Sequence, residues 1–334
     1  MMYEEELIST MDQFLQAGKG ILAADESNNT IGKRFANIGV ENTVENRRKY
    51  RQLLATTPNL GDYINGVILF EETFTQQDEN GVSLAELFIQ QGIMPGIKVD
   101  KGLVNLPNTQ NEQVTQGLDG LEERLLHFKQ LGARFAKWRN VYTINATSPS
   151  IAAIRTGSDI LARYAATCQA VGIVPIVEPE LLMDGMHSII DCAEAYDAIL
   201  HDLFHALFVH QVDLECMVLK PSMVTSGAGL SVIDAPDDVA DYTLNLFRHN
   251  IPAAVPFITF LSGGQTPDQA TINLNAINSA EHQPWTLSFS FGRALQEECL
   301  KAWGGQDAYI QQAQEKLLQR AQALNLACFG EYGE

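Results

Sequence analysis

Eight short apolar runs, each followed by charged or small polar residues, recur along this chain of 334 residues. Such runs are typical of buried strands. The intervals between their ends are roughly 28 to 45 residues, which leaves room for one helix and two loops each time. Strands alternating with helices predict βαβ units on a parallel sheet, and eight units predict an α/β fold closed into a (β/α)₈ or TIM barrel. The runs are residues 20–25, 66–70, 95–100, 135–139, 173–177, 216–221, 257–261 and 285–290.

Helical patterns fill the intervals between these runs. Apolar residues at helical spacing predict an opening helix over residues 7–15. The segment from Asn42 to Glu45 is typical of a capping box and predicts a helix from there through Leu54. Further helical patterns cover residues 118–131, 160–170 and 193–209.

An open, doubly wound sheet is the alternative to a barrel. It would need a glycine-rich dinucleotide turn after the first strand, whereas Gly18-Lys19-Gly20 precedes that strand and lacks the third glycine. The chain has no low-complexity linker and no internal repeat beyond the strand–helix period. We therefore predict one domain over residues 1–334, with a short helical extension over about 1–17 and a last helix over about 308–327.

Composition excludes several kinds of partner. Hydrophobic residues make up 46% of the chain, which is enough for a large core, and the net charge of −19 disfavours nucleic acid and anionic membranes. The acidic start is unlike a targeting peptide, and no apolar run is long enough to span a bilayer. The five cysteines are odd in number and form no C-x-x-C pair, so neither a disulfide framework nor a cysteine-zinc site is indicated. These features together predict a soluble protein of a reducing compartment, most simply the cytoplasm.

Charged side chains lie at the ends of most predicted strands. In a barrel these ends meet in one pocket. Burying many charges together there would lower the stability of the fold, so their presence indicates a functional site. Lys220 ends a buried run, and burial together with a nearby cation such as Lys137 would lower its pKa and make it a nucleophilic amine. The alternative is a lysine with its ammonium group in water. The strand-end charges are Asp25, Lys98, Asp100, Lys137, Arg139, Glu178, Glu180, Lys220 and Arg293.

Other residues receive more specific expectations. Glu178 and Asp25 are candidate general acid and base. Ser262-Gly263-Gly264 and Gly292-Arg293 follow the seventh and eighth strands, where barrels commonly bind phosphate. Two further groups are expected to be structural rather than functional. They are the histidines His201, His205 and His210, for which no metal is predicted, and the basic run Arg47, Arg48, Lys49 and Arg51, predicted to be a solvated helix face or a set of ion pairs.

The strand-end segments carry a family resemblance. The chain resembles the class I, Schiff-base fructose-1,6-bisphosphate aldolases over nearly its whole length. The resemblance implies a metal-independent and cofactor-free TIM barrel, usually a homotetramer, that acts on a phosphorylated sugar in glycolysis and gluconeogenesis. The matching blocks are residues 18–27, 96–102, 135–139, 174–180, 219–221, 259–265 and 292–295.

The resemblance also implies roles for individual residues. Lys220 would form the imine, and Glu178 would be the acid/base for carbinolamine dehydration. Asp25 would take the C4 hydroxyl proton during cleavage, with Lys137 supporting the charge and Glu180 completing the network. The implied C1-phosphate site comprises Ser262, Gly263, Gly264, Gly292 and Arg293, and the implied C6-phosphate side comprises Ser27, Thr30, Lys98 and Arg139, with Lys33 and Arg34 nearby.

Three departures from the family pattern stand out. Thr30 replaces an expected serine but keeps the hydroxyl, and Phe291 replaces a common tyrosine. Many relatives end in a mobile tail whose terminal tyrosine moves a proton, and Tyr332 does not match that position, so another group, slow proton exchange or a truncated tail is expected. The alternatives to fructose 1,6-bisphosphate cleavage are a preference for sedoheptulose 1,7-bisphosphate or fructose 1-phosphate, and a catalytically weak scaffold relative.

Overall fold

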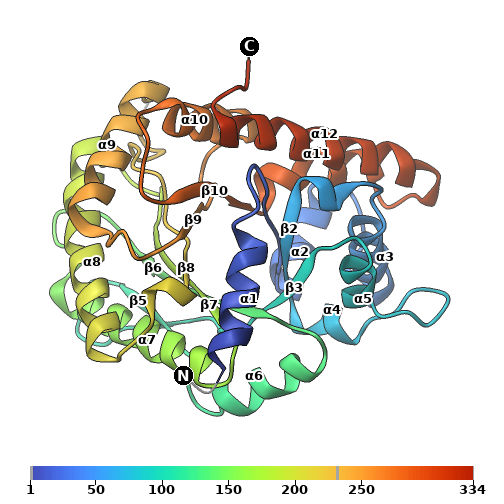
Figure 1. Cartoon of the computed structure of the whole chain (residues 1–334). Coiled ribbons are helices and arrows are strands. Elements are labelled where there is room, and N and C mark those ends of the chain that lie inside the picture. The colour runs from blue at the N-terminus through green and yellow to red at the C-terminus, as the bar shows by residue number, and fades with distance from the viewer. Residues whose placement is uncertain (1–2, 231–232, 334) are drawn as a thin grey trace.

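Eight parallel strands close into a barrel in the computed structural model, which describes residues 3–230 and 233–333. The order around the barrel is β1-β10-β9-β8-β7-β6-β3-β2, and every neighbouring pair is parallel (Figure 1). The predicted TIM barrel is confirmed, and each of the eight apolar runs overlaps a strand. These are β1 (Gly20–Ala24), β2 (Ile64–Leu69), β3 (Met94–Lys98), β6 (Phe135–Tyr142), β7 (Val174–Leu181), β8 (Val218–Leu219), β9 (Phe257–Phe260) and β10 (Thr286–Phe291).

Most helices surround the strands, whereas α1 (Glu4–Phe14) lies across one end of the barrel (Figure 1). This first helix and the last, α12 (Ile310–Phe329), lie close to their predicted ranges. The others are α2 (Asn28–Ala36), α3 (Val44–Ala55), α4 (Glu71–Thr75), α5 (Leu84–Ile89), α6 (Leu121–Gln130), α7 (Ile151–Ala170), α8 (Ile189–Val209), α9 (Pro236–Asn250), α10 (Pro267–Ser279) and α11 (Arg293–Trp303).

The predicted start of α3 was wrong by one residue. Thr43, rather than Asn42, caps the helix, and its hydroxyl accepts the Asn46 backbone N–H at 3.1 Å. The Asn42 side chain is engaged elsewhere, because its amide donates to the Asn28 carbonyl and its oxygen accepts from Arg47. These tertiary contacts decide which of two adjacent capping residues is used.

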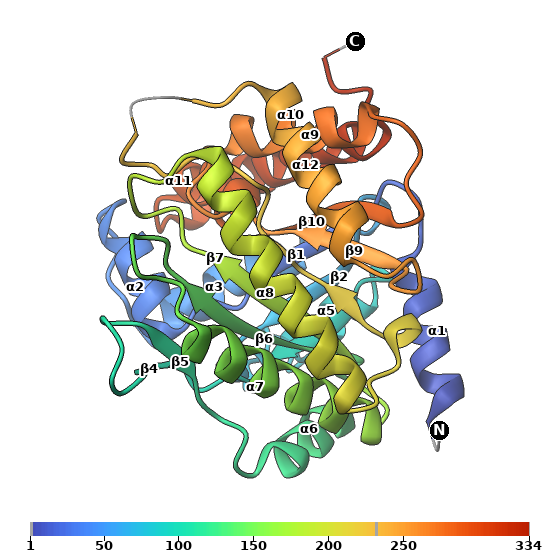
Figure 2. The same cartoon turned by 90° about the vertical axis from the view of Figure 1, so that its left-hand side faces the viewer.

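A small hairpin was not predicted from the sequence. Strands β4 (Leu103–Asn105) and β5 (Gln113–Thr115) pair antiparallel after β3. Thr115 ties the hairpin to β6, since its hydroxyl donates to the Arg139 carbonyl and its N–H to the Asn140 side chain. Figure 2 shows the hairpin and α1 at opposite ends of the barrel.

Helix α1 covers the amino-terminal end of the barrel. Its buried residues Leu7, Met11 and Phe14 join the cluster that fills the barrel interior. The Phe14 ring lies 5.0 Å from that of Phe135 and 5.7 Å from that of Phe257. The interior at the amino-terminal end of the barrel is therefore apolar, and the carboxyl ends of the strands remain available for polar residues.

The packing of α1 generates a first prediction. Phe14→Ala should lower the free energy of unfolding by about 3–5 kcal/mol, because it opens a cavity among buried rings. Urea unfolding measures this loss. The matched control is Ile8→Ala on the same helix, whose side chain is 47% exposed and whose loss should be small. Equal, small effects of both substitutions would show that α1 does not support the barrel.

Candidate active site

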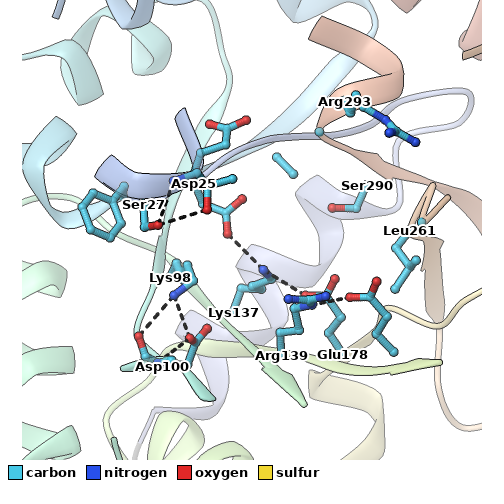
Figure 3. Close-up of a pocket in the computed structure, with 18 of the residues that line it drawn as sticks. Asp25, Ser27, Lys98, Asp100, Lys137, Arg139, Glu178, Leu261, Ser290 and Arg293 are labelled. Carbon is cyan, nitrogen blue, oxygen red and sulfur yellow. Dashed lines mark hydrogen bonds and ion pairs between the residues drawn. The ribbon is translucent and has the colours of Figure 1, made fainter. Parts of the chain in front are cut away.

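One cavity of about 960 Å³ opens at the carboxyl ends of the strands (Figure 3). The structure brings every sequence-predicted site residue to its wall. These are Asp25, Ser27, Thr30, Lys33, Arg34, Lys98, Lys137, Arg139, Glu178, Glu180, Lys220, Ser262, Gly263, Gly264, Gly292 and Arg293. Their convergence follows from the barrel, because the strands are parallel and end on the same side.

The two-residue period of a strand explains why so many charges face inward. On β7, Val174 and Ile176 belong to the barrel interior, so Glu178 and Glu180 continue the same inward face. On β6, Lys137 and Arg139 follow the inward Phe135 by the same rule. Arg139 stands beside Glu178 in the register of the two strands. Apolar residues thus fill the barrel at the amino-terminal ends of these strands, and charged residues fill it at their carboxyl ends.

Four charged side chains form a buried row of ion pairs, here called the central row. Lys220 Nζ lies 3.2 Å from Glu178 Oε1, and Lys137 Nζ lies 3.0 Å from Glu178 Oε2. The same Lys137 Nζ lies 3.0 Å from Asp25 Oδ2, so the order is Lys220–Glu178–Lys137–Asp25. Figure 3 shows Lys137 between the two carboxylates. Each of the four side chains is at most 12% exposed, so the charges depend on one another.

The two lysines of the central row differ in their protonation behaviour. Burial lowers the pKa of Lys220, and the neighbouring Lys137 lowers it further, against the opposing effect of Glu178. Burial also acts to lower the pKa of Lys137, but the Asp25 and Glu178 carboxylates outweigh it and raise that pKa. Lys220 is therefore suited to be a neutral amine, whereas Lys137 remains an ammonium ion.

The carboxyl groups of the central row stay ionised for the corresponding reason. Burial alone would raise the pKa of Asp25, but Lys137 and Lys220 hold it below its usual range. Burial likewise opposes ionisation of Glu178, whose pKa Lys137, Lys220 and Arg139 lower. Two anions flanking one permanent cation can therefore serve as proton acceptors at neutral pH.

Two further ion pairs extend the wall of the cavity. Arg139 Nε donates to Glu180 Oε2 in a short contact. Lys98 Nζ donates to Asp100 Oδ1 at 2.7 Å, and the other Asp100 oxygen is buried without a hydrogen-bond partner among the described residues. Lys98 itself is 18% exposed, so its ammonium group can reach a ligand in the cavity.

Helix starts and glycine-rich turns supply backbone donors at the rim. Ser27 caps α2, and Arg293 is the first residue of α11, so the positive ends of two helices point to the cavity region. Gly264 has φ of +74° in the turn after β9, a conformation that favours glycine. Arg293 is steadied by donation from its Nη2 to the Gln265 carbonyl at 2.9 Å.

Arg34 lines the cavity beside Gly292. Its Nη2 is 3.7 Å from where a β-carbon on Gly292 would stand. This places Arg34 beside a glycine that the resemblance assigned to the C1-phosphate. The reason is a buried carboxylate, Glu26, which accepts from Arg34 Nη1 at 2.5 Å.

The basic run in α3 is only partly solvated. Its four members form ion pairs, as predicted, with Glu72, Glu45, Glu79, Asp307 and Glu26. The alternative of a solvated face was wrong for Arg47 and Arg51, which are 8% and 4% exposed. Carboxylates from other elements cover both guanidinium groups, and a single-sequence pattern does not show such partners. Among the three histidines for which no metal was predicted, His210 forms a polar contact, with its Nε2 2.9 Å from Asp159 Oδ1.

Several cavity residues were not singled out from the sequence. Glu26 directly follows Asp25, and Ser290 precedes Gly292 by two residues, so the strand period could have indicated Ser290. Thr115 arrives on the unpredicted hairpin, and Lys101 pairs with Glu71 at 2.9 Å. Hairpin and ion pair both depend on contacts between separate parts of the chain.

Comparison with known proteins identifies the family. A family model named Glycolytic and described as fructose-bisphosphate aldolase class-I matches residues 6–334. The chain belongs to this family. It is 50% identical over 331 residues to the cytosolic fructose-bisphosphate aldolase 7 of Arabidopsis thaliana, covering 99% of this chain and 92% of that one. It is 51% identical over 330 residues to the chloroplastic fructose-bisphosphate aldolase 1 of Chlamydomonas reinhardtii, covering 99% and 87%.

A solved structure agrees with this assignment. The fructose-bisphosphate aldolase of Plasmodium falciparum, crystallised in a ternary complex with TRAP and a small molecule inhibitor, matches with a TM-score of 0.97 at 50% identity. The match covers 99% of this chain and 96% of that chain. The predicted activity is confirmed: the chain is a metal-independent lyase of the class-I fructose-bisphosphate aldolase family. No helix in the described residues is long and apolar enough to cross a membrane.

The central row generates a second prediction. Lys137→Met should lower the free energy of unfolding at pH 7 by about 3–5 kcal/mol, because it leaves Asp25 buried without its partner. In the wild type, the lowered pKa of Asp25 gives stability that is present above pH 3.8 and is lost as the pH falls through the lowered value. In the variant, burial is opposed by Lys220 and Lys98 but no longer by Lys137, so the pKa of Asp25 should be higher than in the wild type and the deficit should shrink from pH 7 to pH 5.

Urea unfolding at both pH values checks this prediction. The control is Lys101→Met, which removes an exposed lysine of the same cavity and should cost no more than ~1 kcal/mol. An equal loss for Lys137→Met at pH 7 and pH 5 would contradict the assigned coupling.

Proposed function

We propose that the chain cleaves fructose 1,6-bisphosphate reversibly, to dihydroxyacetone phosphate and glyceraldehyde 3-phosphate, through an imine on Lys220. The observation that carries this proposal is the buried Lys220 amine, 3.2 Å from Glu178 and next to an ammonium ion that lowers its pKa. A neutral amine beside a carboxylate is what imine formation on a ketone requires. Family membership supports the substrate, and the geometry supports the residue.

Residues of the central row can carry each step of the proposed reaction. The Lys220 amine adds to the C2 carbonyl, the oxygen gains a proton, and Glu178 serves as acid/base while water leaves to give the iminium ion. The C3–C4 bond then breaks as Asp25 takes the C4 hydroxyl proton. The bonding electrons move into the iminium to form an enamine, which is later protonated at C3 and hydrolysed. Lys137 stabilises the charges on both carboxylates throughout.

Opposite sides of the cavity would hold the two phosphate groups. The turn at Ser262 to Gly264 and the start of α11 at Arg293 supply backbone donors and a guanidinium group for the C1-phosphate. Arg34, beside Gly292, adds charge there. Ser27, Thr30, Lys33, Lys98 and Arg139 are the proposed C6-phosphate side, with Glu180 orienting Arg139.

The imine assignment is tested by trapping. Incubation with dihydroxyacetone phosphate and EDTA, then borohydride, should leave a reduced adduct on Lys220 that peptide mass spectrometry locates. Because the Lys220 pKa is lowered, the rate of adduct formation should rise with pH and level off below 10.5, the ordinary lysine value. An adduct on Lys137 would mean that another strand carries the nucleophile, and no adduct on folded protein would exclude the imine mechanism.

The phosphate assignment predicts a substrate-dependent effect. Lys98→Met should lower kcat/KM for fructose 1,6-bisphosphate by about 10- to 100-fold, the loss expected for one charge-assisted contact. Fructose 1-phosphate lacks the C6-phosphate and should be cleaved nearly as well as by the wild type. Lys101→Met is the matched control. Equal losses on both substrates would place Lys98 outside the C6-phosphate site. Including sedoheptulose 1,7-bisphosphate measures the alternative substrate preference.

Assembly and location are also proposals. A homotetramer follows from the resemblance, and a cytoplasmic location is supported by the cytosolic Arabidopsis relative, although a chloroplastic relative matches equally well. The acidic chain supports neither nucleic acid nor an anionic membrane as a main partner.

A further inference from the structure

A second buried ionic cluster, which we call the Glu26 cluster, lies at the cavity wall. Glu26 directly follows Asp25, and its side chain is 3% exposed. One carboxylate oxygen accepts from Arg34 Nη1 at 2.5 Å and from Gln296 Nε2 at 3.0 Å, and the other accepts from Arg51 Nη2 at 2.5 Å. A single carboxylate is therefore shared between two arginines. The imine mechanism uses neither Glu26 nor Arg51.

The two arginines of this cluster differ in their access to the cavity. Arg51 lies on α3 and is 4% exposed, so it is enclosed by protein. Arg34 lies on α2, is 25% exposed and lines the cavity beside Gly292. Only Arg34 can exchange its carboxylate partner for a phosphate group in the cavity.

Such an exchange is costly unless Glu26 keeps another counter-ion. A buried carboxylate that loses its only cation is strongly destabilised. Burial acts to raise the pKa of Glu26, but Arg51 and Arg34 together hold it below its usual range, so the group stays charged. With Arg51 in place, Glu26 remains paired when Arg34 turns to a ligand.

The position of the Glu26 carboxylate is also fixed by partners other than Arg34. Gln296 Nε2 donates to Glu26 and to the Ala23 carbonyl, while its oxygen accepts from the Tyr50 hydroxyl at 3.0 Å. This arrangement joins α11 and α3 behind the carboxylate. The fixed partners are thus Arg51 and Gln296, and the exchangeable partner is Arg34.

We propose that Arg51 is a positioning residue, which neutralises Glu26 and so leaves Arg34 available for a substrate phosphate group beside Gly292. The inference deepens the proposed function and rests on its phosphate assignment. Without Arg51, Glu26 would retain Arg34 more tightly, and phosphate binding would weaken. Arg51 touches no substrate, so its effect should appear in KM and in phosphate affinity, and not in kcat.

The test begins with inorganic phosphate, which needs no turnover. Arg51→Met should weaken phosphate binding, measured by isothermal titration calorimetry on the folded full chain, by about tenfold, the lower end expected for a contact to a charged group. KM for fructose 1,6-bisphosphate should rise by a similar factor with kcat within twofold of the wild type. Unchanged phosphate affinity in folded Arg51→Met would overturn the proposal.

A double variant separates positioning from simple structural support. Glu26→Gln with Arg51→Met removes the competing carboxylate charge together with its fixed partner, so Arg34 is free again. Phosphate affinity should return to within about threefold of the wild type, since no charge then competes for Arg34. A tenfold loss in the folded double variant would contradict the proposal, and this reading holds even where Arg51→Met alone does not fold.

Arg47→Met is the matched control. Arg47 is a buried arginine one turn earlier on α3, and it pairs with Glu72 rather than with Glu26. Its removal should lower stability and leave phosphate affinity unchanged. If Arg47→Met weakened phosphate binding as much as Arg51→Met does, Arg51 would only stabilise α3, and the proposal would be wrong. A wild type that binds phosphate but fails to cleave the bisphosphate would defeat the proposed function and leave this inference standing.

Discussion

The alternation of charge along the central row is the constraint on which the site depends. Lys220, Glu178, Lys137 and Asp25 are all buried, and each is tolerable only because its neighbours carry the opposite charge. The end of a row has fewer partners than its middle. Lys137 lies between two carboxylates and keeps its proton, whereas Lys220 has one carboxylate partner and a cation close by. One arrangement therefore yields both a permanent cation and a reactive amine from the same residue type.

The barrel makes this row possible by separating apolar from charged layers. Helix α1 and the rings of Phe14, Phe135 and Phe257 fill the amino-terminal end of the barrel, so the charged residues lie against a closely packed apolar layer. Parallel strands then deliver every second residue to the same space above it. Side chains on rigid strands hold their relative positions better than those on loops, which suits pairs that must stay near 3 Å apart.

Local patterns predicted most of the fold and the residues of the site, but few of its pairings. Each strand lies in an apolar run, and most of these runs have a charged residue at the end; neither signal requires knowledge of distant residues. The β4–β5 hairpin was missed because its short strands are stabilised through Thr115 and β6. Burial of Arg51 was missed because Glu26, which covers it, lies outside its helix α3.

The sequence by itself determined that this chain forms a (β/α)₈ barrel and which side chains reach its carboxyl end, since both follow from periodicity along the chain. Only the tertiary structure decided which carboxylate meets which cation. The lowered pKa of Lys220 and the sharing of Glu26 by two arginines belong to that second class. Electrostatic energies depend on distances of a few ångströms and on exclusion of water, and these arise only when separate strands and helices pack together.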